Sequence, residues 1–267
     1  MNKRITIKDI AREAGVSTAT VSYIINDRKD QNISEETKNK VLQVINLFNY
    51  KPNVIAKSLR SFNDVKYIAI YFNDSNKILY QAEILRFCEI LSKRFETSNF
   101  ELVIPKKDYK KLDNVDAILS LNNTKDDFHQ IGILNFIPLI AIDTIIDDDI
   151  FFSVTTDYAK LKEIGDEKFK DNYCFICLKP KDDEICEEIL KIFEKVQFIE
   201  GVADLQNINS NNIFTINKTI NDIIIANFPD KEVFFHREFA HRKCDVIVKC
   251  IQQSLSHIKY DQHKFKV

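Results

Sequence analysis

The chain has 267 residues, 45% of them hydrophobic and 29% charged, with a formal net charge of −2. This length and apolar content are enough for a sizeable core and about two domains. No signal-like segment opens the sequence and no apolar run approaches the roughly 18 residues of a membrane span, so we expect a cytoplasmic protein with no membrane partner.

The first sixty residues contain two short helices joined by a tight, glycine-containing turn. Thr6 can cap a helix over residues 7–14, with Asp9 completing a capping box. Ser17 can cap a second helix over residues 18–25. Two helices joined in this way form a helix-turn-helix, although a generic helical hairpin would show the same corner.

A third helix is expected over residues 35–48, capped by Ser34, and Pro52 prevents its continuation. The apolar residues of the second and third helices recur at helical spacing and predict a small three-helix core. These inward-facing residues are Val21, Ile24, Ile25, Val41, Leu42, Ile45 and Phe48.

Charge is distributed unevenly along the chain. Residues 1–60 contain eleven Lys and Arg against six Asp and Glu, whereas the other residues contain twenty-seven against thirty-four. A basic end on an acidic body is typical of a nucleic-acid contact at that end, although solvated helix faces also carry basic residues.

The same stretch carries a dense set of motif residues: Asp9-Ile10-Ala11, Ala14-Gly15-Val16-Ser17, Thr20-Val21-Ser22, Asn26, Glu35-Glu36-Thr37, Tyr50, Pro52-Asn53, Ala56 and Ser58-Leu59-Arg60. Together they closely resemble the headpiece of lactose- and galactose-repressor-type transcription regulators, the LacI/GalR family. The resemblance implies an all-α helix-turn-helix headpiece over residues 1–61. It also implies an α/β, two-lobed, periplasmic-binding-protein-like domain over residues 62–267.

A helix-turn-helix lays its second helix in the major groove of double-stranded DNA. The resemblance places Thr18, Ala19 and Tyr23 at the base-reading positions, although Tyr23 could instead pack at the edge of the core. None of the three is Arg or Lys, so they cannot supply the bidentate guanine contact. Phosphate contacts that fix the register are expected from Thr6, Ser17, Thr20, Ser22, Asn26, Arg28 and Lys29, with Lys3 and Arg4 nearby.

Residues 53–60 resemble the hinge helix of the same family. Eight residues are too few for a stable isolated helix, so we expect this segment to fold on binding DNA. The resemblance implies that two hinge helices pair in the minor groove and that Leu59 wedges into a base step, with Asn53, Ala56 and Arg60 beside it. Such pairing implies a homodimer on a palindromic operator.

Beyond the hinge, apolar strands alternate with helices, which favours a parallel α/β sheet. The expected strands are residues 66–72, 100–104, 115–121, 138–142, 151–155, 173–178 and 223–226. The expected helices are residues 78–95, 158–169, 183–196 and 240–255. One or two of the family's βα units are missing near the end, so a reduced second lobe is expected.

The effector-contact motifs of the family are only partly present. The resemblance leaves Ser75, Asn76, Asp157 and Asn227 as candidate effector contacts, and an Arg-containing motif of the second lobe cannot be found. Two functions therefore remain open for the body. It could sense a small sugar-like effector, or it could be an effector-independent module for dimerisation or for a co-regulator.

No constellation of residues supports catalysis, a cofactor or a metal site. The sequence has no Gly-rich phosphate loop and no triad-like spacing. Cys174 and Cys177 lie in an apolar strand and should face opposite sides as core residues, like Cys88 and Cys186 on helices. His236, His241 and Cys244 suggest a surface or subunit contact rather than a zinc site. We predict a sequence-specific DNA-binding transcriptional regulator, a repressor, that is not an enzyme.

Overall fold

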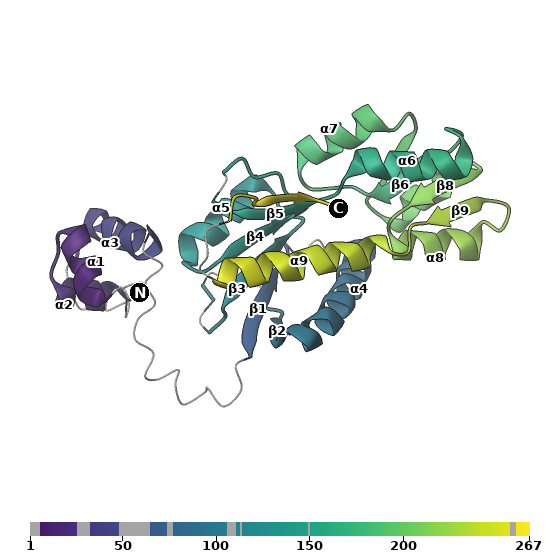
Figure 1. Ribbon diagram of the computed structural model, residues 1–267. Coiled ribbons are helices and arrows are strands. Elements are labelled where there is room, and N and C mark those ends of the chain that lie inside the picture. The colour runs from purple at the N-terminus through teal and green to yellow at the C-terminus, as the bar shows by residue number, and fades with distance from the viewer. Residues whose placement is uncertain are drawn as a thin grey trace. The chain divides into compact units, whose positions relative to one another are not determined.

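The computed structural model describes residues 6–25, 33–47, 65–73, 77–105, 111–112, 114–148, 150–256 and 260–267. They fall into two compact units, one within residues 1–64 and the other from Val65 to Val267 (Figure 1). Several predicted features lie outside the described residues: Asn26, Arg28, Lys29, the hinge segment 53–60 with Asn53, Ala56, Leu59 and Arg60, and also Ser75 and Asn76. No helix in the described ranges is long and apolar enough to cross a bilayer.

The N-terminal unit contains three helices, α1 (Ile7–Ala14), α2 (Thr18–Ile25) and α3 (Glu35–Leu47). The predicted bounds of the first two are confirmed, and the third begins at Glu35 as expected, with its predicted last residue, Phe48, outside the described residues. The capping interaction at α1 is present, because the backbone N–H and hydroxyl of Thr6 both donate to the Asp9 carboxylate, at 3.0 and 2.7 Å. The buried core of the unit consists of Ile10, Ala11, Ala14, Val21, Ile24, Val41 and Val44.

The first lobe of the second unit is built on a six-stranded parallel sheet in the order β10-β5-β4-β3-β1-β2. Its strands are β1 (Lys66–Tyr71), β2 (Phe100–Val103), β3 (Ala117–Leu121), β4 (Leu139–Ile142), β5 (Phe152–Thr155) and β10 (Lys264–Lys266). The helices packed on it are α4 (Ile78–Phe95), α5 (Lys125–Leu134) and α9 (Phe239–Ser256), and a 3-10 turn η2 (Glu96–Ser98) follows α4.

Alternating side chains of the first sheet pack into two different cores, as the strand period requires. Ile68 and Leu119 pack under α4 and α9, which lie side by side on one face (Figure 1). Ala69 and Ile118 pack under α5 on the opposite face. Because both faces are covered, the strands are almost continuously apolar.

The second lobe is built on a four-stranded parallel sheet in the order β7-β6-β8-β9. Its strands are β6 (Cys174–Leu178), β7 (Val196–Ile199), β8 (Asn212–Thr215) and β9 (Glu232–Phe235). Its helices are α6 (Tyr158–Phe169), α7 (Asp183–Ile192) and α8 (Lys218–Asn227), with a 3-10 helix η3 (Val202–Asn207) after β7. This sheet is smaller than the first, in keeping with the reduced second lobe expected from the sequence.

The chain returns to the first lobe after β9, and its C-terminal residues complete that lobe. Cys244, Ile247 and Cys250 of α9 are buried in the first-lobe core. Strand β10 then pairs in parallel with β5, and the N–H of Val267 donates to the carbonyl of Thr155 at 3.0 Å.

Two sequence-based assignments in the second lobe are wrong. The strand expected over residues 223–226 lies inside helix α8, because Ile220 and Ile224, one helical turn apart, are both fully buried while Ile225 is exposed. The helix expected over 183–196 ends at Ile192, and the chain then turns into β7. Helix α5 and strands β7, β8, β9 and β10 were not predicted.

The cysteines are core residues. Cys174 packs on the α8 side of the second sheet and Cys177 on the α6 side, which confirms the predicted opposite facing. All six cysteines are free and buried, so the surface role expected for Cys244 is wrong. Within the described ranges, no three His, Cys, Asp or Glu residues are grouped so that they could hold a metal ion.

Candidate functional site

The outer face of α2 is the candidate nucleic-acid interface. Val21 and Ile24 bury one side of this helix, which leaves Thr18 and Ala19 exposed at its N-terminal end and Tyr23 half-buried. Ala19 and Tyr23 are four residues apart and therefore neighbours on the helix surface. All three predicted base-reading positions thus remain accessible.

The turn before α2 is fixed by local hydrogen bonds. Gly15 adopts the left-handed conformation with φ of 68°, which allows the chain to turn sharply after α1. Ser17 then caps α2, because its hydroxyl accepts from the N–H of Thr20 at 3.0 Å. Thr6 and Ser17 are exposed, and Thr20 and Ser22 are half-buried. These predicted phosphate-contact residues lie near the N-terminal ends of α1 and α2, where backbone N–H groups favour anions.

A second candidate site is a cavity of about 350 Å³ between the two lobes of the α/β unit. It lies at the carboxyl ends of strands from both sheets: Leu121 ends β3, Leu178 ends β6 and Phe235 ends β9. Open α/β sheets bind their ligands at this edge. The hydrophobic lining includes Ile84, Phe87, Ile90, Leu121, Ile216, Phe235 and Phe239.

An ion pair between buried Lys243 and half-buried Asp143 lines part of this cavity. The ammonium of Lys243 lies 2.5 and 2.7 Å from the two carboxylate oxygens of Asp143 and 2.9 Å from the hydroxyl of Thr156. Lys243 is only 4% exposed, and these three acceptors use all of its donors, which offsets the cost of burying the charge. Burial, with the nearby Asp143 charge, also raises the pKa of Tyr158, so its hydroxyl stays protonated.

Helix α4 of the first lobe makes direct contacts with the second lobe. Leu79 is only 2% exposed and packs in the second-lobe core beside Ile176. The Glu83 carboxylate accepts from the N–H groups of Lys218 and Thr219, at 3.1 and 3.0 Å, and so provides acceptors for two backbone donors at the start of α8. One helix therefore fastens the two lobes together through both apolar and polar contacts.

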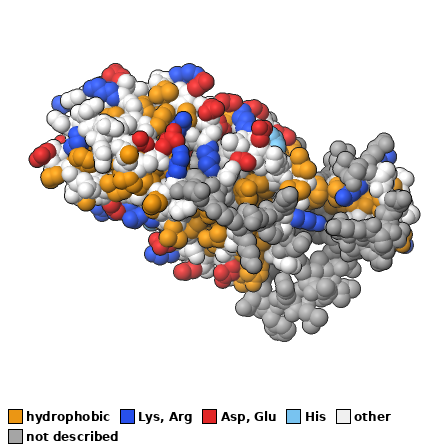
Figure 2. All heavy atoms as spheres, turned by 180° about the vertical axis from the view of Figure 1, so that it is seen from behind, with side chains coloured by type: hydrophobic (Ala, Val, Ile, Leu, Met, Phe, Trp, Pro, Cys, Tyr) orange, Lys and Arg blue, Asp and Glu red, His pale blue; other side chains and the backbone are white. Residues whose placement is uncertain are grey.

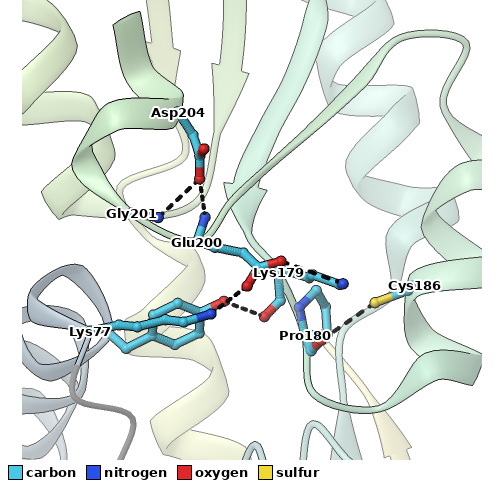
Figure 3. A network of polar contacts seen from close by, with 8 residues as sticks. Lys77, Lys179, Pro180, Cys186, Glu200, Gly201 and Asp204 are labelled. Carbon is cyan, nitrogen blue, oxygen red and sulfur yellow. Dashed lines mark hydrogen bonds and ion pairs between the residues drawn. The ribbon is translucent and has the colours of Figure 1, made fainter. Parts of the chain in front are cut away.

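A polar network at the start of α4 adds further contacts between the two lobes (Figure 3). Lys77 forms an ion pair with Glu200, and the Tyr80 hydroxyl donates to the carbonyl of Lys179 at 2.6 Å. Asp204 accepts from the N–H of Glu200 at 2.8 Å, which orders the loop carrying this carboxylate. The hydrogen bond from Lys77 lowers the pKa of Glu200 below its usual 4.5.

The Lys77–Glu200 pair predicts a defined pH dependence. A carboxylate with a lowered folded-state pKa stabilises the fold above its unfolded pKa, and this contribution is lost as pH falls through the folded value. We expect Glu200→Gln to reduce the free energy of unfolding by a constant amount above about pH 5. The difference from the parent should shrink in more acidic solution. Urea unfolding at a series of pH values measures it.

A matched control for this experiment is Glu187→Gln. The Glu187 carboxylate pairs with Lys191 of its own helix and does not bridge the lobes. A Glu200→Gln difference that stayed unchanged down to pH 3, or one equalled by Glu187→Gln at every pH, would contradict a pH-dependent interlobe contact.

The predicted effector residues within the described ranges do not line the cavity. Asp157 caps α6 by accepting from the N–H of Lys160 at 3.1 Å. Asn227 is exposed at the end of α8, where its amide donates to the carbonyl of Ile223 at 2.8 Å. The cavity instead gathers polar residues that sequence reasoning missed: Asn122, Asp143, Asn217, Arg237, His241 and Lys243. Most of them follow strand ends, but Asn217 and Arg237 follow β8 and β9, which were not recognised as strands.

Comparison with known proteins gives a family match at the N-terminal end and relatives that match more than half of the chain. Residues 6–53 match the family described as bacterial regulatory proteins, lacI family. The chain is 34% identical to the HTH-type transcriptional regulator RegA of Clostridium saccharobutylicum over 58% of this chain and 48% of that protein. It is 31% identical to catabolite control protein A of Staphylococcus epidermidis over 60% of this chain and 50% of that protein. The matched region thus spans about half the length of these relatives.

A solved structure supports the fold of the α/β unit. A LacI family transcriptional regulator from Enterococcus faecalis V583, determined with bound ribose, matches 76% of this chain and 95% of its own chain. The TM-score is 0.51 and the sequence identity 12%, so this likeness concerns the fold alone.

Proposed function

We propose that this chain, identified by its N-terminal segment as a member of the lacI family of bacterial regulatory proteins, is a transcriptional repressor that binds a palindromic operator as a homodimer. The observation that carries the proposal is the solvent-facing side of α2, where Thr18, Ala19 and Tyr23 stand on a helix fixed by the Ser17 cap. Figure 2 shows acidic and basic side chains mixed over the visible face of the α/β unit. That mixture favours the more basic N-terminal segment as the DNA contact.

The chemistry of the three side chains suggests how bases are read. Thr18 can donate or accept a hydrogen bond, Ala19 can pack against a thymine methyl group, and Tyr23 offers a ring and a hydroxyl. Thr6, Ser17, Thr20, Ser22, Asn26, Arg28 and Lys29 would fix the register on phosphates. The hinge residues Asn53, Ala56, Leu59 and Arg60 would enter the minor groove.

Salt dependence tests this mode of binding. Fluorescence anisotropy of the full chain with a labelled duplex should show affinity falling steeply and log-linearly with salt concentration, because phosphate contacts release counterions. Affinity that did not change between low and high salt would contradict a phosphate-anchored interface.

For the α/β unit we propose the binding of a small effector between the lobes. The cavity at the carboxyl ends of both sheets supports this role, and the ribose bound to the Enterococcus faecalis regulator makes a sugar-like molecule the first candidate. An effector that binds one arrangement of the lobes better than another would shift the hinge, with couplings typically of about 1–3 kcal/mol.

The interlobe contacts of α4 favour a second candidate, an effector-independent body. Leu79 and Glu83 hold the lobes together through side chains of the chain itself. In that case the unit would serve only dimerisation or a co-regulator. A thermal-shift screen of the full chain against sugars, phosphosugars and nucleobases separates the two roles, since a body without an effector would show no stabilisation by any of them.

An exposed groove between α4 and β2 is the proposed homodimer face. It includes Leu85 and Ile104, which are 59% and 55% exposed, and runs beside β2, an edge strand of the first sheet. Exposed apolar side chains next to an unpaired strand edge favour association. A second copy presenting the same groove would cover both the apolar side chains and the strand edge, as two-fold symmetry requires.

Replacing Leu85 by Asp is expected to convert the dimer to a monomer at micromolar concentration, because two buried carboxylates would face each other across the symmetry axis. Analytical ultracentrifugation measures the change. Leu190→Asp is the matched control, since Leu190 is 57% exposed on α7 of the other lobe. Equal dimer dissociation constants for the two variants would place the interface elsewhere.

A further inference from the structure

We propose that the interlobe cavity takes a small acidic molecule with an apolar body, a carboxylate or a phosphate ester, rather than a neutral sugar. This inference rests on the effector role proposed above and replaces the sugar-like candidate given there. It follows from which polar groups of the cavity are already occupied and which are left.

The carboxylates inside the cavity are used by the protein itself. Both oxygens of Asp143 accept from Lys243, and both oxygens of Glu83 accept from the start of α8. A sugar presents many hydroxyl groups, each of which is a donor that needs an acceptor when it is buried. This cavity offers few acceptors to them.

Glu89 is the remaining carboxylate among the described residues that line the cavity. It is exposed, and it also borders the outer groove between α4 and β2. It therefore lies at the rim and leaves the interior without a free carboxylate from the described residues.

The groups that remain are donors: half-buried His241 and two asparagines, with the exposed Arg237 at the rim of the cavity, as Glu89 is. The side-chain oxygens of Asn122 and Asn217 accept from the N–H groups of Lys181 and Leu178, at 3.1 and 3.0 Å, which leaves their NH₂ groups available. The side chains of Arg237 and His241 form no hydrogen bond or ion pair with any residue that the structure describes. An arginine in this state is suited to bidentate recognition of a carboxylate or phosphate.

The hydrophobic wall specifies the other half of the ligand. Ile84, Phe87, Phe235 and Phe239 line the cavity together with the donors. A volume of about 350 Å³ is at the lower end for small-molecule sites, which usually combine an apolar wall with a few placed polar groups. A flat or short apolar body with one acidic group fits both requirements.

Binding of defined probes to the full chain tests this inference. Isothermal titration calorimetry would compare benzoate and phenyl phosphate with neutral benzamide and with D-ribose. We expect one of the acidic probes to bind and to raise Tm, and both neutral probes to have no effect. Arg237→Gln should weaken that binding by at least about tenfold, the usual size of a lost hydrogen bond between charged groups. Preference for benzoate or for phenyl phosphate distinguishes a carboxylate from a phosphate ligand.

Arg242→Gln is the matched control, because Arg242 is, like Arg237, an exposed arginine, lies five residues further along the chain on α9, and does not line the cavity. Binding of the acidic probe should be unchanged in that variant. Equal weakening in both variants, or none in Arg237→Gln, would overturn the assignment, since acidic probes could then be bound at the basic N-terminal segment. Binding of D-ribose alone would overturn the ligand class but leave the effector role standing. Failure of all four probes to bind would overturn the inference. If the thermal-shift screen of sugars, phosphosugars and nucleobases also showed no stabilisation, the effector role itself would be contradicted.

Discussion

Ala19→Glu is expected to weaken binding of the operator duplex by at least about a hundredfold, without unfolding the N-terminal unit. Ala19 is exposed on α2, next to Tyr23 on the helix surface, so a longer side chain there meets no buried neighbour. A carboxylate at a surface that faces phosphates places like charges together, which costs several kcal/mol in a complex. A loss of about 3 kcal/mol corresponds to a hundredfold in Kd.

Anisotropy titration with a duplex enriched from a random library measures this loss, and far-UV circular dichroism checks that the helices persist. Ala226→Glu is the control, because it makes the same change in charge at an exposed position of α8 in the other unit. If Ala19→Glu and Ala226→Glu bound the duplex equally well, α2 could not be the helix that contacts DNA.

Leu79→Ala is expected to lower the free energy of unfolding of the α/β unit by about 2–5 kcal/mol, the usual range for deleting a buried leucine side chain. Leu79 belongs to a helix of the first lobe but is buried among residues of the second-lobe core, so the loss removes packing between lobes. The cavity left behind cannot collapse without moving α4 relative to the second sheet. Urea unfolding followed by circular dichroism measures the change.

The adjacent residue offers a matched control. Ile78 is 73% exposed on the same turn of α4, so Ile78→Ala removes a similar volume without emptying a core. Its effect should stay within about 0.5 kcal/mol, as for most surface substitutions. Equal destabilisation by the two substitutions would contradict the role of Leu79 as an anchor between lobes.

The N-terminal unit could be predicted from the sequence because its signals are local. Thr6 with Asp9, Gly15 and Ser17 each act within four residues along the chain, and the bounds of α1 and α2 follow directly from them. The alternation of apolar strands likewise predicted most of the first lobe, where both faces of the sheet are covered.

The second lobe and the cavity depend on contacts between distant residues, and here prediction failed. The run Ile223–Ile224–Ile225 has the composition of a strand. Only the burial of Ile220 and Ile224 on the same face, one helical turn apart, distinguishes it as part of a helix. The apolar runs within β8 and β9 are only Ile213-Phe214 and Val233-Phe234-Phe235, too short to show a clear period. The polar residues that come after them could therefore not be assigned to a strand end.

Asp157 and Asn227, the candidate effector residues within the described ranges, have structural roles at helix ends and do not line the cavity. Each satisfies backbone groups at a helix end, Asp157 at the start of α6 and Asn227 at the end of α8. Asn and Asp frequently take this role regardless of any ligand. The cavity residues Arg237 and His241 were separated in the sequence from every motif that suggested an effector.

In vitro selection of binding sites from a random duplex library, using the full chain, tests the proposed function most directly. A dimeric reader with one α2 helix per half-site should enrich a two-fold symmetric sequence whose half-sites lie about one helical turn, roughly 10 base pairs, apart. The Ala19→Glu variant should enrich nothing under the same conditions. Enrichment of a single asymmetric motif, or the same sequences from parent and variant, would contradict a symmetric dimer that reads DNA through α2.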